Sequence, residues 1–237
     1  MSSRAWRASS RTQDPASLVR QVQAGDDAHT ERLNAFLGRA VAAVREAFGG
    51  PVSYASLAGE PVDWRPFDFV GIDHYRDARI RDHYADMLRP FFNTGKPVVV
   101  TETGMRGYQG AADSGTLSFG VIDNRSLLLH HLPLAGHLVK ARLNGRYVRD
   151  EALQARELTD ILGQLNVAGV DGVFVSSFVE PMAPFSEDPR HDLDMSALSL
   201  VKSLPGGEGT TYPGMPWEPK EAFRAVAGCY AGPAHQG

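Results

Sequence analysis

Several apolar runs of the chain end in polar side chains that could do chemistry, and the run over residues 97–103 is the clearest. Alternation along a strand places Val98, Val100 and Glu102 on one face, so that an apolar face ends in a carboxylate. Active sites of α/β proteins gather at the carboxyl ends of parallel strands. A carboxylate there can act as a nucleophile or as a general acid or base. Glu102 is therefore the first candidate catalytic residue.

Two other apolar runs end in a similar way. Asp73 and Tyr75 share one face of the run over residues 67–75, and Phe178 and Glu180 share one face of a later run. Each also has a structural interpretation, because Asp73 and Tyr75 can hydrogen-bond a loop and Glu180 can begin a solvated one. Polar residues at three strand ends of one sheet together favour a functional site.

The elements that must position these residues follow from the hydrophobic pattern. Four short runs rich in Val, Ile, Phe and Tyr are the strand candidates: Pro51–Ser56, Phe67–Tyr75, Pro97–Thr103 and Gly172–Val179. Apolar spacings of three and four predict helices over Ala28–Phe48, Ile80–Phe92, Asn124–Leu143, Asp150–Leu165 and Glu218–Ala231. Strands that alternate with helices and lack a clean polar face predict a parallel sheet covered by helices. The predicted fold class is α/β.

Length and charge restrict the class of protein further. The 237 residues carry a formal net charge of −4, which leaves no global positive field to hold a nucleic acid. No apolar run is long enough to cross a membrane, and the single cysteine, Cys229, has no partner for an intramolecular disulfide. We therefore expect a soluble, cytoplasmic protein. An Arg/Ser-rich, disordered tail is predicted over residues 1–27, and one domain over residues 28–237.

The stretch Gly-Lys-Pro-Val-Val-Val-Thr-Glu-Thr-Gly, residues 95–104, resembles the seventh strand of retaining glycoside hydrolases of clan A, which are (β/α)8 barrels. In that clan the Glu at this strand end is the nucleophile, so the resemblance gives this role to Glu102. The run Phe67–Tyr75 resembles the sixth strand, whose terminal aromatic hydroxyl commonly touches the nucleophile. The resemblance thus implies that Tyr75 contacts Glu102.

The same resemblance implies a carbohydrate-binding site around Glu102. Phe178 is the nearest equivalent of the tryptophan that usually stacks on a sugar at the end of the eighth strand. Asp73, His74 and Glu180 stand at or near strand ends, where they would contact the substrate. Trp64 offers a second ring for stacking on sugar, although a packing role is an equal alternative.

A narrower resemblance covers nearly everything after residue 30. It is carried by the segments Glu60–Trp64, Arg149–Glu151, Asp188–Met195 and Tyr212–Lys220. These segments are similar to a group of actinobacterial barrel proteins labelled abortive (phage) infection proteins. That label names a process and no chemistry.

The four strand candidates use all the residues from Pro51 onward, whereas a full barrel takes about 250 residues. We therefore expect a partial TIM barrel, the second half of a (β/α)8 barrel. In clan A the acid/base Glu ends the fourth strand, and no run before Pro51 ends that way. Retaining hydrolysis needs a second carboxyl group about 5 Å from the nucleophile. Asp73, Glu180 and Glu60 remain open alternatives, and we expect little or no glycosidase activity.

The expected partners follow from this half-barrel. Two sheet edges would carry unpaired backbone groups, and two copies pairing edge to edge would restore eight strands, so we expect a homodimer. A carbohydrate is the expected ligand. The alternatives are a non-catalytic phage-defence factor that binds a sugar or a protein, and a truncated gene product.

No cofactor or metal is expected. His130, His131 and His137 have no Cys or acidic residue at a ligand spacing. The aspartates within residues 188–194 lack the glycine and the distal Glu of a calcium loop. The glycine-rich segment over residues 104–120 lacks the Gly-x-x-x-x-Gly-Lys pattern that cradles phosphate.

Overall fold

The computed structural model describes residues 27–114, 120–132 and 138–231. The predicted tail lies outside the described residues apart from Asp27, and so does His137. Contacts divide the chain into two compact units. The first unit contains the chain up to His74, Arg79–Thr103 and Gln164–Phe174, and the second contains Tyr75–Ala78, Gly104–Gly163 and the chain from Val175 onward. The single domain predicted over residues 28–237 stays a prediction.

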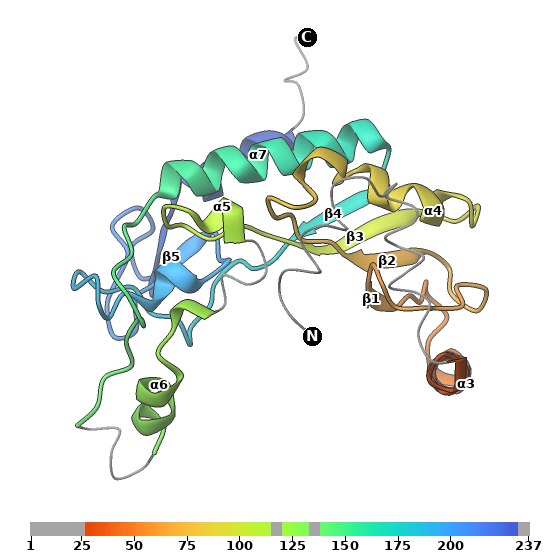
Figure 1. Ribbon diagram of the computed structural model, residues 1–237, viewed down its shortest axis with the longest axis horizontal. Coiled ribbons are helices and arrows are strands. Elements are labelled where there is room, and N and C mark those ends of the chain that lie inside the picture. Colours follow the sequence, from red (N-terminus) through yellow and green to blue (C-terminus); the bar gives the residue numbers. More distant parts are fainter. Residues whose placement is uncertain (1–26, 115–119, 133–137, 232–237) are drawn as a thin grey trace, which may run out of the picture. The chain divides into compact units, whose positions relative to one another are not determined.

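A four-stranded parallel sheet confirms the predicted α/β class (Figure 1). Its strands are β1 (Ala55–Leu57), β2 (Val70–Asp73), β3 (Val98–Thr103) and β4 (Gly172–Val175), in the order β1-β2-β3-β4. Each strand falls within or next to a predicted apolar run. The strands are shorter than those runs, so Tyr75, Phe178 and Glu180 lie on the segments that follow β2 and β4.

The two faces of this sheet differ in burial. Ser56, Ile72 and Val100 lie in register across β1, β2 and β3, and none of their side chains is more than 1% exposed. The other face carries Leu57, which is 60% exposed, in register with Asp73. The apolar side chains of the covered face therefore supply the hydrophobic burial that stabilises the strands.

The helices of the first unit depart in part from the predicted pattern. Helix α3 (Asp27–Ala47) confirms the first predicted helix. The helix predicted over Ile80–Phe92 is instead divided into two 3-10 turns and a short α-helix: η1 (Arg81–His83), η2 (Asp86–Leu88) and α4 (Arg89–Phe92). Pro90 in the first turn of α4 is the physical reason, because proline donates no amide hydrogen and clashes with the carbonyl four residues earlier.

The second unit contains the remaining elements. They are α5 (Ala111–Ser114), α6 (Asn124–His130), most of α7 (Glu151–Ala168), η4 (Leu193–Ser196), β5 (Val201–Ser203), β6 (Trp217–Pro219) and α8 (Glu221–Ala231). Strands β5 and β6 pair antiparallel. Asp150 caps α7 as predicted, because its carboxylate accepts the Leu153 N–H at 2.8 Å. None of the described helices is both long enough and apolar enough to cross a bilayer.

Buried ion pairs hold the segments of the second unit together. The ammonium of Lys220 is fully buried and lies 3.0 Å from the carboxylate of Asp194. Arg149 pairs with the same carboxylate at 2.9 Å and with Asp192 at 2.6 Å. Removing one member of such a group typically costs about 3–5 kcal/mol, because the remaining charge is left buried without a partner.

Candidate active site

Glu102 and Asp73 end neighbouring strands of the first unit. They are paired in register across β2 and β3, and the register shifts between Ile72 and Asp73 because β3 contains one extra residue there, Thr101. Strict alternation, which predicted that Glu102 continues the face of Val98 and Val100, is therefore wrong at this strand end. Glu102 is exposed, whereas Thr103 is fully buried.

This register shift places the carboxylates of Asp73 and Glu102 on the less buried face of the sheet, which also carries Leu57. Asp73 is partly buried there, and Thr101 Oγ1 donates a hydrogen bond to its Oδ1 at 2.8 Å. Neighbouring strands lie about 4.8 Å apart, so carboxyl groups in register on one face can stand near the roughly 5–5.5 Å that retaining glycosidases use.

The surroundings of Asp73 favour its protonated form. Burial is the main cause that raises the pKa of Asp73, and the negative charges of Glu102 and Glu60 act in the same direction. The hydrogen bond from Thr101 opposes this shift. A pair of carboxyl groups in which one keeps its proton is the arrangement that acid/base catalysis requires.

Glu60 and Tyr54 extend this group of acidic side chains. The Tyr54 hydroxyl lies 3.4 Å from both carboxylate oxygens of Glu60, and Glu60 also accepts the Leu57 N–H at 3.1 Å. Burial raises the pKa of Tyr54, and the charges of Glu60 and Asp73 add to that effect. Tyr54 is a residue that the sequence analysis missed, because it lies before the end of its strand candidate.

His74 holds the end of β3 beside Glu102, and its buried side chain is not accessible to a ligand. Its backbone N–H donates to the carbonyl oxygen of Glu102 at 2.8 Å, and its ring stacks on Tyr84 at 4.1 Å. The ring nitrogen Nε2 lies 2.7 Å from the Tyr84 carbonyl oxygen. Burial lowers the pKa of His74 to about 4. A neutral, enclosed imidazole of this kind positions the strand end.

Trp64 is a packing residue in this structure. Its side chain is 8% exposed, and its ring lies 5.6 Å from that of Phe67. Stacking on a sugar needs an open ring face. Of the predicted first-unit residues, the structure therefore brings together Glu102 and Asp73, with His74 supporting them and Trp64 in the core.

Tyr75, Phe178 and Glu180 belong to the second unit and have different surroundings. Phe178 packs edge-on against Trp217 and Phe223, at 5.1 Å and 6.2 Å between ring centroids. Glu180 accepts the Leu198 N–H at 2.7 Å. Phe178 thus belongs to an aromatic cluster, and Glu180 holds a neighbouring loop.

The buried Arg106 is a further feature of this unit that sequence analysis missed. Its Nε–H donates to the Ser196 carbonyl oxygen at 2.6 Å. Burial lowers the pKa of Arg106, and the nearby groups of Tyr108, Glu180 and Tyr75 oppose that shift. Tyr75 and Glu180 therefore share one cationic neighbour. Among the described residues, no group of three or more His, Cys, Asp or Glu side chains is arranged to hold a metal ion.

Comparison with known proteins gives a match in structure and none in sequence. No family model and no curated protein matches the chain. A solved structure described as a GH113 beta-1,4-mannanase, and another of a complex of such an enzyme, each match with a TM-score of 0.52 and 14% sequence identity. Each match covers 86% of this chain and 53% of the mannanase chain.

Fold and comparison together define an α/β chain that matches part of a glycoside hydrolase TIM-barrel enzyme. The chain spans about half the length of the enzymes that it matches. The resemblance to clan A barrels seen in the sequence is thereby supported at the level of the fold. The resemblance to abortive infection proteins stays a prediction.

Proposed function

We propose that this chain carries the nucleophile site of a retaining glycoside hydrolase-like barrel, with Glu102 as the nucleophile and Asp73 as its acid/base partner. The observation that carries the proposal is the pairing of the two residues in register at the ends of β2 and β3. Asp73 is favoured over Glu60 and Glu180 as the second carboxyl group because it stands directly opposite Glu102 and its pKa is raised.

The reaction then proceeds by double displacement. The Glu102 carboxylate forms a bond to the anomeric carbon while the bond from that carbon to the leaving oxygen breaks, and Asp73 gives its proton to that oxygen. In the second step Asp73 takes a proton from water, and the resulting hydroxyl attacks the same carbon and releases Glu102. A β-linked mannoside is the first substrate to test, because the matched enzymes are described as beta-1,4-mannanases.

Trapping of the covalent intermediate tests the proposal even where turnover is slow. The chain is incubated with 2-deoxy-2-fluoro-β-mannosyl fluoride, and its intact mass and the labelled peptide are determined. We expect one added sugar on the peptide that contains Glu102, and no label on Glu102→Gln. Asp73→Asn should slow hydrolysis of 4-nitrophenyl β-mannoside by about 100-fold, which is typical of a lost general acid.

Glu46→Gln is the matched control, because Glu46 is an exposed carboxylate on α3, away from the strand ends. This variant should be labelled and should turn over as the original chain does. Label on a residue other than Glu102, or unchanged turnover in Glu102→Gln, would show that the assignment is wrong.

Binding of a carbohydrate without turnover is the second candidate function. The exposure of Glu102 favours it, because a solvated carboxylate is a weaker nucleophile than one in a water-excluded site. A phage-defence role would fall within this candidate. Calorimetric binding of mannotetraose that is unchanged in Glu102→Gln, together with no trapped sugar, would favour this function over catalysis.

A further inference from the structure

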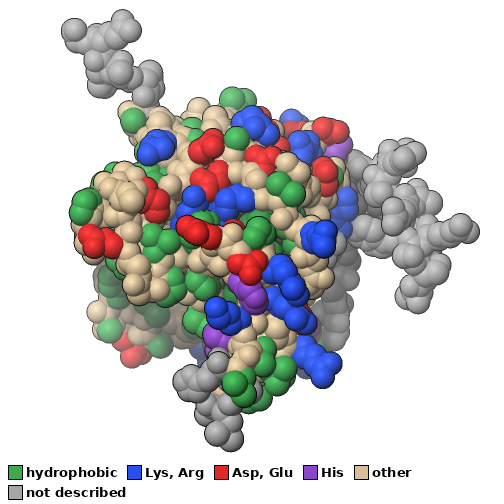
Figure 2. Space-filling model, turned by 90° about the vertical axis from the view of Figure 1, so that its left-hand side faces the viewer, with side chains coloured by type: hydrophobic (Ala, Val, Ile, Leu, Met, Phe, Trp, Pro, Cys, Tyr) green, Lys and Arg blue, Asp and Glu red, His purple; other side chains and the backbone are tan. Residues whose placement is uncertain are grey.

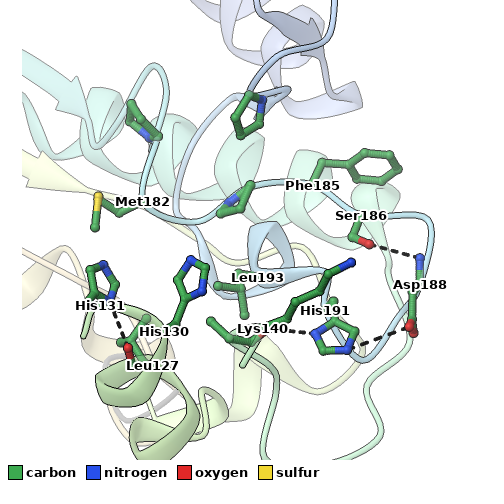
Figure 3. Close-up of a pocket in the computed structure, with 14 residues that line it drawn as sticks. Leu127, His130, His131, Lys140, Met182, Phe185, Ser186, Asp188, His191 and Leu193 are labelled. Carbon is green, nitrogen blue, oxygen red and sulfur yellow. Dashed lines mark hydrogen bonds and ion pairs between the residues drawn. The ribbon is translucent and has the colours of Figure 1, made fainter. Parts of the chain in front are cut away.

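A pocket of about 710 Å³ is lined by residues of the second unit, and neither Glu102 nor Asp73 is among them. Helix α6, the segment around Lys140 and the loop from Pro181 to Leu193 supply most of its lining (Figure 3). We call it the histidine pocket, because His130, His131 and His191 line it together with Lys140. The resemblance to glycoside hydrolases assigns no role to these side chains.

Each of the three histidines is fixed through the same ring nitrogen. The Nδ1 atoms of His130, His131 and His191 lie 2.8–2.9 Å from the carbonyl oxygens of Val139, Leu127 and Ala141, respectively. A carbonyl oxygen only accepts hydrogen bonds, so each Nδ1 carries the hydrogen. In the neutral ring Nε2 is then a hydrogen-bond acceptor.

Two of these acceptors are open to a ligand. The rings of His130 and His131 both line the pocket, and Figure 3 shows the His131 ring next to Met182. Neither Nε2 atom makes a hydrogen bond to another described residue, whereas Nε2 of His191 lies 4.0 Å from the Asp188 carboxylate. Ring nitrogens that can accept a hydrogen bond in an open pocket suit hydroxyl donors such as those of a sugar.

Positive charge surrounds these acceptors on a chain whose net charge is −4. A second depression, of about 440 Å³, is lined by Arg142, Arg146 and Arg190. On the face of the molecule that Figure 2 displays, Lys and Arg side chains lie next to histidines in the lower part of the picture.

The two depressions are joined through the backbone, because the Leu143 N–H donates to the Arg190 carbonyl oxygen at 2.8 Å. The same two segments therefore line both depressions.

Most of this charge has no carboxylate partner. Arg142 pairs with Asp123 at 2.9 Å, but among the described residues no carboxylate pairs with the side chains of Lys140, Arg146 or Arg190. The other acidic group in the lining is Asp188, which is exposed, and Glu180 lies in an adjoining small pocket that shares His131. The surroundings thus retain an excess of positive charge, which attracts an anionic group.

Most of the other described residues that line the histidine pocket are apolar, Ser186 and Asp188 being the exceptions. The apolar residues include Leu127, Met182, Phe185, Leu193 and three prolines: Pro181, Pro184 and Pro205. The face of a sugar ring that carries C–H groups packs on such a wall, its hydroxyls can donate to imidazole nitrogens, and a carboxylate on the ring would pair with Lys140 or an arginine. A neutral sugar would form no ion pair with these cations, and an inorganic anion would make no apolar contact with the wall.

We infer that the histidine pocket binds a uronate, the carboxylate-bearing sugar of an acidic polysaccharide. The choice of a sugar among anionic ligands rests on the proposed function, whereas the choice of an anion rests on the cations themselves. The pocket thereby gives the chain a binding site for acidic polysaccharide that has no residue in common with the paired carboxylates of the first unit.

Calorimetry with trigalacturonate at low salt and neutral pH tests this inference, and the methyl ester of the same trisaccharide serves as the neutral probe. We expect trigalacturonate to bind at least about tenfold more tightly than its ester, because only the carboxylate can form charge-assisted hydrogen bonds with the lysine and the arginines. Lys140→Gln and Arg190→Gln should each weaken binding of trigalacturonate by about tenfold and leave the ester unaffected. His130→Phe should weaken both probes, because it removes an acceptor for hydroxyls.

Arg224→Gln on α8 is the matched control, because Arg224 is an exposed arginine outside both depressions. It should bind trigalacturonate as the original chain does. Equal affinity for acid and ester, no binding of either, or equal weakening by Arg224→Gln would overturn the inference. So would a single-stranded oligothymidylate that binds more tightly than trigalacturonate and is displaced by the same substitutions, because the surface would then recognise nucleic acid.

The proposed function is tested separately, because this experiment measures binding and needs no turnover. Glu102→Gln should bind trigalacturonate as the original chain does. Uronate binding with no trapped sugar on Glu102 would refute the catalytic proposal alone, and a trapped sugar with no uronate binding would refute the inference alone.

Discussion

Glu102 and Asp73 stand opposite each other, yet their surroundings give them different properties. Glu102 is exposed, whereas Asp73 is partly buried and has a raised pKa. The sequence located both residues, because each follows a short apolar run. It left the choice among Asp73, Glu60 and Glu180 open, because burial and charge neighbours depend on contacts between segments far apart in the chain.

The burial of two cationic side chains could not be predicted from sequence patterns, for a related reason. Arg106 is 3% exposed and Lys220 is fully buried. Arginine and lysine usually lie at the surface, so they carry no signal for burial in a hydrophobic pattern. Each becomes a core residue only because backbone and side-chain oxygens from other segments surround it: Ser196 for Arg106, and Asp194 and Ser199 for Lys220.

His74 should make the stability of the chain depend on pH. Its pKa is about 4 in the folded chain and about 6.5 in the unfolded one, so between these values the unfolded state binds more protons. The stabilising contribution is therefore complete above pH 6.5 and is lost as the pH falls toward 4. A shift of this size corresponds to about 3 kcal/mol.

Urea unfolding of the original chain and of His74→Gln, from pH 7.5 to pH 4, measures this contribution. The loss of unfolding free energy on acidification should be smaller in the variant by about 3 kcal/mol. Both proteins contain the same carboxylates, so the difference between them isolates the histidine. Parallel pH profiles would show that His74 takes up a proton as readily in the folded chain as in the unfolded one.

At the scale of elements, the positions of strands were easier to predict than their ends. Val98 and Val100 of β3 are fully buried, as an apolar run predicts. The extra residue Thr101 reverses the alternation after them, and no residue type near it signals the change. Helix α6 likewise ends at His130, short of the predicted Leu143.

Cysteine accessibility tests the irregular end of β3. In a Cys229→Ser background, Glu102→Cys should react readily with a thiol reagent, whereas Val100→Cys and Thr103→Cys should react at least about tenfold more slowly, because a buried thiol reacts only when the structure opens locally. Cys229 must be replaced first, since it is exposed. Strict alternation would instead make the cysteine at position 102 as protected as the one at position 100.

At the scale of the whole molecule, the sequence predicted the second half of a barrel, and the structure matches part of a barrel enzyme. The match covers 53% of the mannanase chain. Periodicity predicted the strands and helices because each of them is a local unit, whereas their assignment to the second half of a barrel came from the resemblance to clan A. The division into two units could not be read in the same way, because it depends on contacts between distant segments.

The sheet ends at β1 on one side and β4 on the other, and an edge strand presents unpaired backbone groups to other chains. In β1 this edge also carries Leu57, which is 60% exposed. In the same unit Phe36 of α3 and Phe48, which directly follows this helix, are exposed as well. These features support the expected homodimer, with β1 as the pairing edge.

Light scattering during size-exclusion chromatography should therefore give about twice the chain mass of 25.7 kDa. Leu57→Lys should shift the protein toward the monomer, because a charge on an edge strand opposes pairing with another chain. Leu128→Lys is the matched control: Leu128 is 65% exposed but lies on α6 in the second unit, so this variant should remain dimeric. A monomer with a single cooperative thermal transition would contradict the edge-pairing model. A dimer that Leu57→Lys leaves intact would place the interface elsewhere.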